Sequence, residues 1–276
     1  MPIIRQFLEE GHEVIIGADK NPLAFLRQEF PTLKTITIPG YEVTYGEKVK
    51  TLKLFYESIK FFNFIKEEHS AIDKIIDDNN IDMLVSDNRY GLWSKKVESI
   101  IITHQLFVKA PLGEKLAHQK IEKLISNFDE CWIPDVEGKP NFSGDLSHLK
   151  PIKMKYKFIG VLSRFSSFCH TESVEVLKEE YDVIAIISGP EPQRTIFEKL
   201  VLEQIQKNKL KAVVVLGKPH FTLSGAEERS LDETNKKEIA DQVRNDEHVR
   251  IFNHLKTEEL YNCIQKSKVV ICRAGY

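Results

Sequence analysis

A strand, a turn and the start of a helix follow one another in the stretch VIAIISGPEPQR, residues 183–194. Five consecutive apolar residues, four of them β-branched, are typical of a strand that is buried on both faces of a parallel sheet. The glycine and two prolines of residues 188–192 end this strand, and the amphipathic segment 193–207 predicts a helix. This order is that of a βαβ unit and predicts an α/β fold.

The same alternation extends outward in both directions. We predict further strands at residues 212–217, 249–252 and 269–272, with a helix at 257–266, and five strands in the first half at 13–17, 35–38, 83–86, 99–103 and 130–134. A length of 276 residues is sufficient for two domains. The segment 135–173 is rich in glycine and proline and has little periodicity. We therefore predict two doubly wound Rossmann-like domains, residues 1–150 and 151–276.

Both ends of the chain depart from a complete doubly wound sheet. Such a sheet begins with the strand that becomes its centre, but an apolar helical run begins here at Pro2. The apolar run 269–272 is followed by only four residues. We expect the first strand of the N-terminal domain and the end of the C-terminal domain to be missing. The charged stretch 224–247 predicts a surface insertion.

Composition excludes several classes of function. The 39 basic and 41 acidic side chains give a net charge of −2, so we expect no nucleic-acid partner. The four cysteines form no C-x-x-C pair, which argues against structural zinc and favours the cytoplasm. No metal-binding or phosphate-loop motif is present, so we expect neither metal nor cofactor. Residues 48–66, rich in Lys and Phe, allow peripheral association with the inner face of a membrane.

Polar residues follow the predicted strands of the second half, where an open α/β sheet binds its ligands. Ser188 and Gly189 come directly after one strand and Arg194 opens the next helix, so these residues are suited to an anionic ligand. Arg273, Ala274 and Gly275 follow another strand, and His254 a third. The alternatives are a strand-to-helix turn with an N-cap serine at 188 and a simple loop histidine at 254.

A second group follows two strands of the first half. Asp87 and Arg89 come after one predicted strand, and His104 and Gln105 come after the next. His104 or Asp87 has the chemistry of a general base that removes a proton from a hydroxyl group. The alternatives are a hydrogen-bonded structural histidine and a turn or helix cap at Asp87.

Three passages resemble the MurG-like glycosyltransferases, a family with the GT-B fold. The opening residues 2–5, with Leu8 and residues 11–14, are similar to the helix and strand after the family's glycine-rich loop. Residues 183–194 are similar to the strand and loop that open its donor domain. The run KVVICRAG, residues 268–275, closely matches the family's "ADVVVCRSGA" strand and turn at the diphosphate.

The resemblance implies an inverting, metal-independent glycosyltransferase that moves a hexosamine, N-acetylglucosamine, from a UDP-sugar to the hydroxyl of a lipid-linked or glycan acceptor. Residues 1–150 would bind the acceptor and residues 151–276 the nucleotide-sugar. His104 and Asp87 would be catalytic, and Arg89 and Gln105 would bind the acceptor. The donor-binding residues would be Ser188, Gly189, Arg194, His254, Arg273, Ala274 and Gly275.

The chain also departs from the family pattern. It has His104-Gln105-Leu106 where the family has Glu-Gln-Asn, so the acceptor is expected to differ. The family's glycine-rich loop would precede Met1, and its ribose-binding acidic residue would follow Tyr276. Two further readings therefore stay open: a nucleotide-sugar epimerase of the same fold, and a truncated remnant without catalytic activity.

Overall fold

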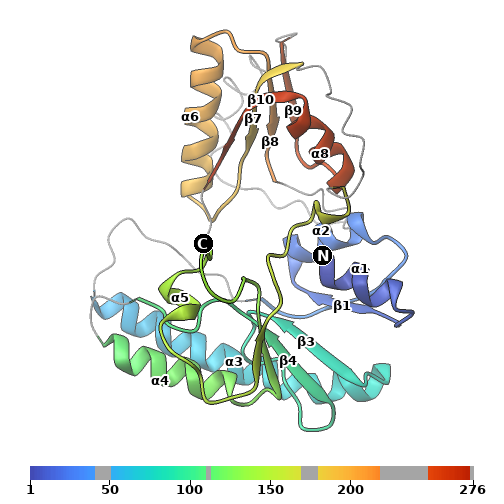
Figure 1. Cartoon of the computed structure of the whole chain (residues 1–276), viewed down its shortest axis with the longest axis vertical. Coiled ribbons are helices and arrows are strands. Elements are labelled where there is room, and N and C mark those ends of the chain that lie inside the picture. The colour runs from blue at the N-terminus through green and yellow to red at the C-terminus, as the bar shows by residue number, and fades with distance from the viewer. Residues whose placement is uncertain (41–50, 110–112, 169–179, 218–247, 274–276) are drawn as a thin grey trace. The chain divides into compact units, whose positions relative to one another are not determined.

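The chain forms two compact units, described here from a computed structural model (Figure 1). The structure describes residues 1–40, 51–109, 113–168, 180–217 and 248–273. Unit 1 combines Met1–Glu47 with Arg164–Gly275, and unit 2 comprises Lys48–Ser163. The units are defined by contacts within the structure. The division into domains 1–150 and 151–276 stays a prediction.

Unit 1 contains a four-stranded parallel sheet with the order β10-β7-β8-β9. Of the four strands of this sheet, β7 comes first in the chain. It lies inside the sheet, with β8 on one side and β10 on the other. The chain therefore reverses its direction of winding between β7 and β10, which in open α/β sheets is where ligands bind. The strands are β7 (Tyr181–Ile186), β8 (Ala212–Val215), β9 (Val249–Phe252) and β10 (Ser267–Cys272).

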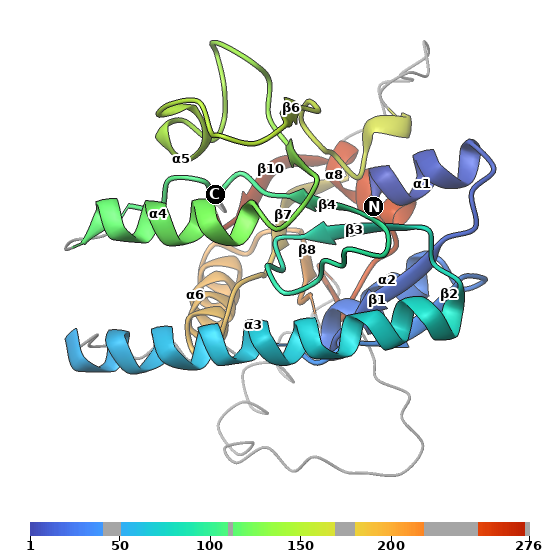
Figure 2. The same cartoon turned by 90° about the horizontal axis from the view of Figure 1, so that it is seen from below.

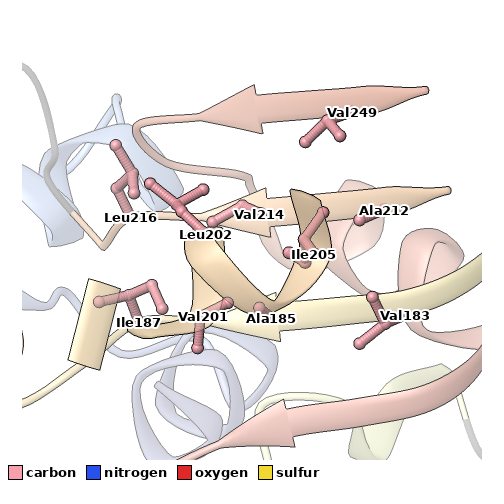
Figure 3. Packing of buried hydrophobic residues seen from close by; sticks show 10 residues of the cluster. All are labelled: Val183, Ala185, Ile187, Val201, Leu202, Ile205, Ala212, Val214, Leu216 and Val249. Carbon is pink, nitrogen blue, oxygen red and sulfur yellow. The ribbon is translucent and has the colours of Figure 1, made fainter. Parts of the chain in front are cut away.

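Helices cover both faces of this sheet, as Figure 1 shows for α6 (Gln193–Lys207) and α8 (Thr257–Gln265). Alternate residues of each strand point to opposite faces. On one face, Val183 and Ala185 of β7 pack with Val201 and Ile205 of α6 (Figure 3). On the other face, Ile184 belongs to a separate buried cluster with residues of the α8 side. Burial on both faces explains the uninterrupted apolar run of β7.

The N-terminal part of unit 1 is a small α/β layer of its own. Helices α1 (Pro2–Glu9) and α2 (Lys20–Glu29) alternate with the parallel pair β1 (Ile15–Ala18) and β2 (Lys34–Thr37). Its buried core residues are Ile16, Ala18, Leu23 and Phe30. The short helix η1 (Ser166–Phe168) also belongs to unit 1.

Unit 2 has a second parallel sheet, with the order β3-β4-β5-β6. The long helix α3 (Thr51–Asn79), which runs across the view in Figure 2, precedes this sheet in the chain. Helix α4 (Glu114–Ile125) connects β4 to β5, and α5 (Asp145–His148) lies between β5 and β6. No helix among the described residues is long and apolar enough to cross a membrane. The strands are β3 (Met83–Asp87), β4 (Glu98–Ile102), β5 (Glu130–Ile133) and β6 (Tyr156–Phe158).

The structure confirms all nine predicted strands to within a few residues, and the predicted helix 193–207 has the bounds of α6. No helix or strand was predicted in 135–173, and the structure has α5, β6 and η1 there. β6 has only three residues, and Lys155 and Lys157 beside and within it interrupt the apolar pattern. The predicted insertion 224–247 lies outside the described residues.

Close packing of the β3–β4 loop on α3 gives a test of this fold. A Cβ atom at Gly91 would lie 2.5 Å from the Ile65 carbonyl oxygen and 2.6 Å from the Glu68 Cβ. We expect Gly91→Ala to lower the free energy of unfolding by about 1–3 kcal/mol, because overpacking forces backbone or side-chain shifts. Urea denaturation measures this loss. Ser70→Ala on the exposed face of α3 is the control, expected within about 0.5 kcal/mol; equal stability of both variants would contradict the packing.

Candidate functional site

The carboxyl ends of β7 and β10 bring two of the predicted ligand segments together in unit 1. Gly189 follows β7 with φ +107, a conformation that favours glycine. A Cβ atom at this position would collide with the Arg273 guanidinium, which follows β10. Arg273 Nη2 donates a hydrogen bond to Gln193 Oε1 at 2.8 Å. Ser188, Gly189 and Arg273 are all exposed, so this edge presents a hydroxyl group and a cation to solvent.

The first turn of α6 is held by Glu191. Glu191 Oε2 accepts hydrogen bonds from Thr195 N at 3.2 Å and from Thr195 Oγ1 at 2.7 Å. Although desolvation raises the pKa of Glu191, hydrogen bonds from Thr195 and Arg194 outweigh it and lower the pKa below its ordinary value. Glu191 is therefore a carboxylate that fixes the start of the helix.

Arg194 points inward from the same turn. Its Nη1 donates to Glu191 Oε1 at 3.0 Å, and its Nη2 donates to the Leu216 carbonyl at 2.7 Å and lies 3.5 Å from Glu198 Oε2. Only 9% of its side chain is exposed. The guanidinium thus ties the β7–α6 loop to the end of β8. Its predicted contact with a ligand phosphate stays a prediction.

His254 lies apart from Arg273 in the sheet order, because it follows β9 at the opposite edge. Its ring makes an edge contact with Phe25 of α2, with ring centroids 5.0 Å apart. Desolvation lowers the pKa of His254, and the nearby Arg164 guanidinium lowers it further. Ala274 and Gly275 lie outside the described residues.

Sequence reasoning missed a buried carboxylate beside His254. Glu29 of α2, whose side chain is 4% exposed, accepts hydrogen bonds from Thr257 N at 2.9 Å and Thr257 Oγ1 at 2.8 Å. Arg164 Nη2 donates to Glu29 Oε1 at 2.8 Å, and Arg5 lies 3.6 Å from Oε2. A negative charge at the first residue of α8 is favourable because of the helix dipole. The partners are 135 and 228 residues away in sequence, so no local motif marks this cluster.

Unit 2 brings Asp87 and His104 to one edge of its sheet. Asp87 ends β3, and His104 follows β4 by two residues. Asn88 Oδ1 accepts a hydrogen bond from Thr103 Oγ1 at 2.9 Å, which connects the two strand ends. Gln105 N donates to Thr103 Oγ1 at 3.0 Å, while the Gln105 side chain is half-buried.

The two titratable groups of this edge influence each other. Desolvation raises the pKa of Asp87, and the nearby His104 opposes the rise. Desolvation lowers the pKa of His104, and Asp87 and Asp135 oppose the fall. His104 is therefore held largely as neutral imidazole near pH 7, the form that can accept a proton.

Arg89 is directed toward α3. Its Nε donates to Glu68 Oε1 at 2.6 Å, and the Glu68 side chain is 2% exposed. Burial raises the pKa of Glu68, and the charge of Arg89 opposes this rise. This ion pair fixes the β3–β4 loop on α3, and the predicted acceptor contact of Arg89 stays a prediction.

Among the described residues, no group of His, Cys, Asp and Glu is arranged to hold a metal ion.

The comparisons with known proteins bear on the fold. No protein-family model matches this chain, and neither does any curated protein. A crystal structure of Glycyrrhiza uralensis UGT73P12 complexed with glycyrrhetinic acid 3-O-monoglucuronide matches 97% of this chain and 68% of that chain, with 13% identity and a TM-score of 0.52. An S. aureus MnaA–UDP structure matches 95% of this chain and 74% of that one, with 12% identity and a TM-score of 0.48.

The first of these similarities confirms the predicted fold class. The chain is an α/β protein with parallel sheets that match the GT-B fold. At 13% identity the likeness concerns the fold alone. The narrower resemblance to the MurG-like branch stays a prediction.

The inward position of Arg194 predicts a structural cost for its removal. Arg194→Met would remove this donor from the Leu216 carbonyl and the Arg194 cation from beside Glu198. We expect a loss of about 1–3 kcal/mol in the free energy of unfolding, because a polar group loses its partner in a partly buried place. Chemical denaturation measures the loss. Lys199→Met on the same helix removes only an exposed pair at 3.9 Å and should cost less than about 0.5 kcal/mol. A similar small cost for Arg194→Met would contradict the contacts described.

Proposed function

We propose that this protein is a glycosyltransferase that moves a hexosamine, N-acetylglucosamine, from a UDP-sugar to an acceptor hydroxyl group, with inversion and without a metal. The observation that carries the proposal is the convergence of Gly189 and Arg273 at the switch point between β7 and β10. The GT-B fold supports it, because this edge is where an open α/β sheet takes a nucleotide.

The donor diphosphate fits this edge chemically. Gly189 has no side chain, so backbone N–H groups can approach phosphate oxygens closely. Arg273 offers a planar cation that suits bidentate hydrogen bonds to phosphate. Ser188 adds an exposed hydroxyl group. We assign the diphosphate to these three residues and to Ala274 and Gly275, and the donor's remaining contacts to Arg194 and His254.

The acceptor chemistry is assigned to His104 and Asp87 of unit 2. Neutral His104 accepts the proton of the acceptor hydroxyl group, while the hydroxyl oxygen forms a bond to the anomeric carbon. The bond between that carbon and the β-phosphate oxygen breaks, and UDP leaves with the bonding electron pair. Arg273 stabilises the charge that develops on the leaving diphosphate. Asp87 stabilises the imidazolium that forms, and Arg89 and Gln105 are assigned to the acceptor.

The resemblance of residues 183–194 and 268–275 to MurG-like enzymes supports a lipid-linked or glycan acceptor. On this proposal the protein acts in the cytoplasm, in peripheral contact with the inner face of a membrane when the acceptor is lipid-linked. A nucleotide-sugar epimerase would instead convert its donor with no acceptor present. Incubation of UDP-N-acetylglucosamine with the protein alone, followed by chromatography, separates the two activities: conversion of the sugar without acceptor would contradict the transferase proposal.

Calorimetric titration with UDP and UDP-N-acetylglucosamine, without metal, tests the donor site. We expect Arg273→Ala to weaken UDP binding at least tenfold, because hydrogen bonds to a charged group contribute about 1.5–3 kcal/mol. Lys268→Ala on the same strand is the matched control, since this lysine pairs with Asp182 at the other end of β10. Unchanged UDP affinity in Arg273→Ala would remove Arg273 from the site.

The pH dependence of transfer tests the proposed base. Because desolvation holds the pKa of His104 below its ordinary value, kcat/KM should rise with pH and level off at a pH below that expected for an ordinary histidine. His104→Gln should remove this acidic limb and lower kcat by about 10²–10⁴. A pH–rate profile of both proteins measures this, and persistence of the limb in His104→Gln would contradict the assignment.

A further inference from the structure

The segment that carries His104 is anchored on both sides of the imidazole. Before it, Thr103 Oγ1 donates to Asn88 Oδ1 at 2.9 Å. After it, the backbone N–H groups of Leu106 and Phe107 both donate to the carbonyl oxygen of Leu146, each at 2.9 Å. Leu146 lies in the short helix α5, so the place of His104 depends on where α5 is held.

Helix α5 is held in turn by one buried carboxylate, Asp135, which follows β5 and is 0% exposed. Asp135 Oδ2 accepts hydrogen bonds from Ser143 N at 2.8 Å and from Ser143 Oγ, and lies 3.2 Å from His148 Nε2. The Ser143 and Ser147 hydroxyl groups are also hydrogen-bonded to each other. Asp135 Oδ1 accepts from Val136 N at 2.8 Å and Phe142 N at 3.2 Å. A single carboxylate thus closes the 135–143 loop and holds Ser143, two residues before α5, and His148, the last residue of α5.

We propose that Asp135 is a positioning residue for His104: it fixes α5, and the Leu146 carbonyl of α5 fixes the chain that follows the imidazole. What His104 does in catalysis rests on the proposed function, whereas its dependence on Asp135 does not. The two residues are 31 positions apart in the chain, and both follow neighbouring parallel strands. Parallel pairing of β4 and β5 therefore brings them to the same edge.

The negative charge of Asp135 also affects the protonation of His104. Desolvation raises the pKa of Asp135, but hydrogen bonds from Ser143, Phe142 and Val136 lower it more, so the carboxylate stays ionised in any physiological buffer. Its negative charge and that of Asp87 both favour the imidazolium form of His104. Helix α5 itself carries two further titratable side chains: Asp145, paired with Lys109 at 2.9 Å, and His148, which contacts Asp135.

A carboxylate that acted on His104 through its charge alone would change the pKa of His104 but would leave the surroundings of the neutral ring as they are. NMR of the full chain with ¹³C-labelled histidine separates the two roles, because it follows the titration of His104 without substrate. We expect Asp135→Asn to lower the pKa of His104 and to shift its resonance in the neutral form. Asp145→Asn, which alters an exposed carboxylate on the same helix, should leave both unchanged. An unchanged resonance of neutral His104 in Asp135→Asn would overturn the proposal, whatever happens to its pKa.

A second variant keeps the test decisive where Asp135→Asn fails to fold. Ser147→Ala removes one hydroxyl group from the same network. We expect faster hydrogen exchange of the Leu106 and Phe107 amides and a shifted His104 resonance, and wild-type behaviour of both would overturn the proposal.

Kinetics then connect the position of His104 to the reaction. In the folded Asp135 variant, kcat for transfer should fall at least tenfold while the affinity for UDP is unchanged, and an unchanged kcat would count against a role in the reaction. Failure of the wild-type chain to bind UDP would contradict the proposed function and leave the NMR result standing.

Discussion

Parallel strand pairing is the constraint on which both candidate sites depend, because it makes neighbouring strands end at the same edge of their sheet. In unit 1, Cys272 pairs with Ile186, so Arg273 and Gly189 emerge one and three residues beyond this pair. In unit 2, Asp87 pairs with Ile102, which places Asp87 beside the chain that leads to His104. The register therefore selects which polar residues meet, and the loops only refine their positions.

Buried charged side chains hold the loops that follow or precede these strands in fixed conformations. Glu29, Glu68, Asp135 and Arg194 are each almost enclosed, and each is bonded to a loop or helix end that follows or precedes a strand. An enclosed charge without partners would cost several kcal/mol, so every such group restricts the loop around it to the conformation that supplies its hydrogen bonds. This explains how exposed groups such as Arg273 and half-buried groups such as His104 can be held in place beside solvent.

The sequence predicted the elements well because burial leaves a periodic pattern. Uninterrupted apolar runs indicated β7 and β8, and the prolines before α6 indicated where this helix begins. Strand β6 was not predicted from the sequence, because Lys155 and Lys157 interrupt the apolar run at this edge of the sheet. The inward direction of Arg194 and the roles of Glu29 and Asp135 could not be predicted, since their partners are distant in sequence or depend on loop geometry.

We assign the nucleotide diphosphate of the donor to the carboxyl ends of β7 and β10. Titration of ¹⁵N-labelled protein with UDP, followed by amide chemical shifts, tests this most directly because it locates the ligand in the unmodified chain. We expect the largest changes among the described residues on Ser188, Gly189 and Arg273 and on the first turn of α6. Saturable changes confined to unit 2, or no changes at millimolar UDP, would contradict it.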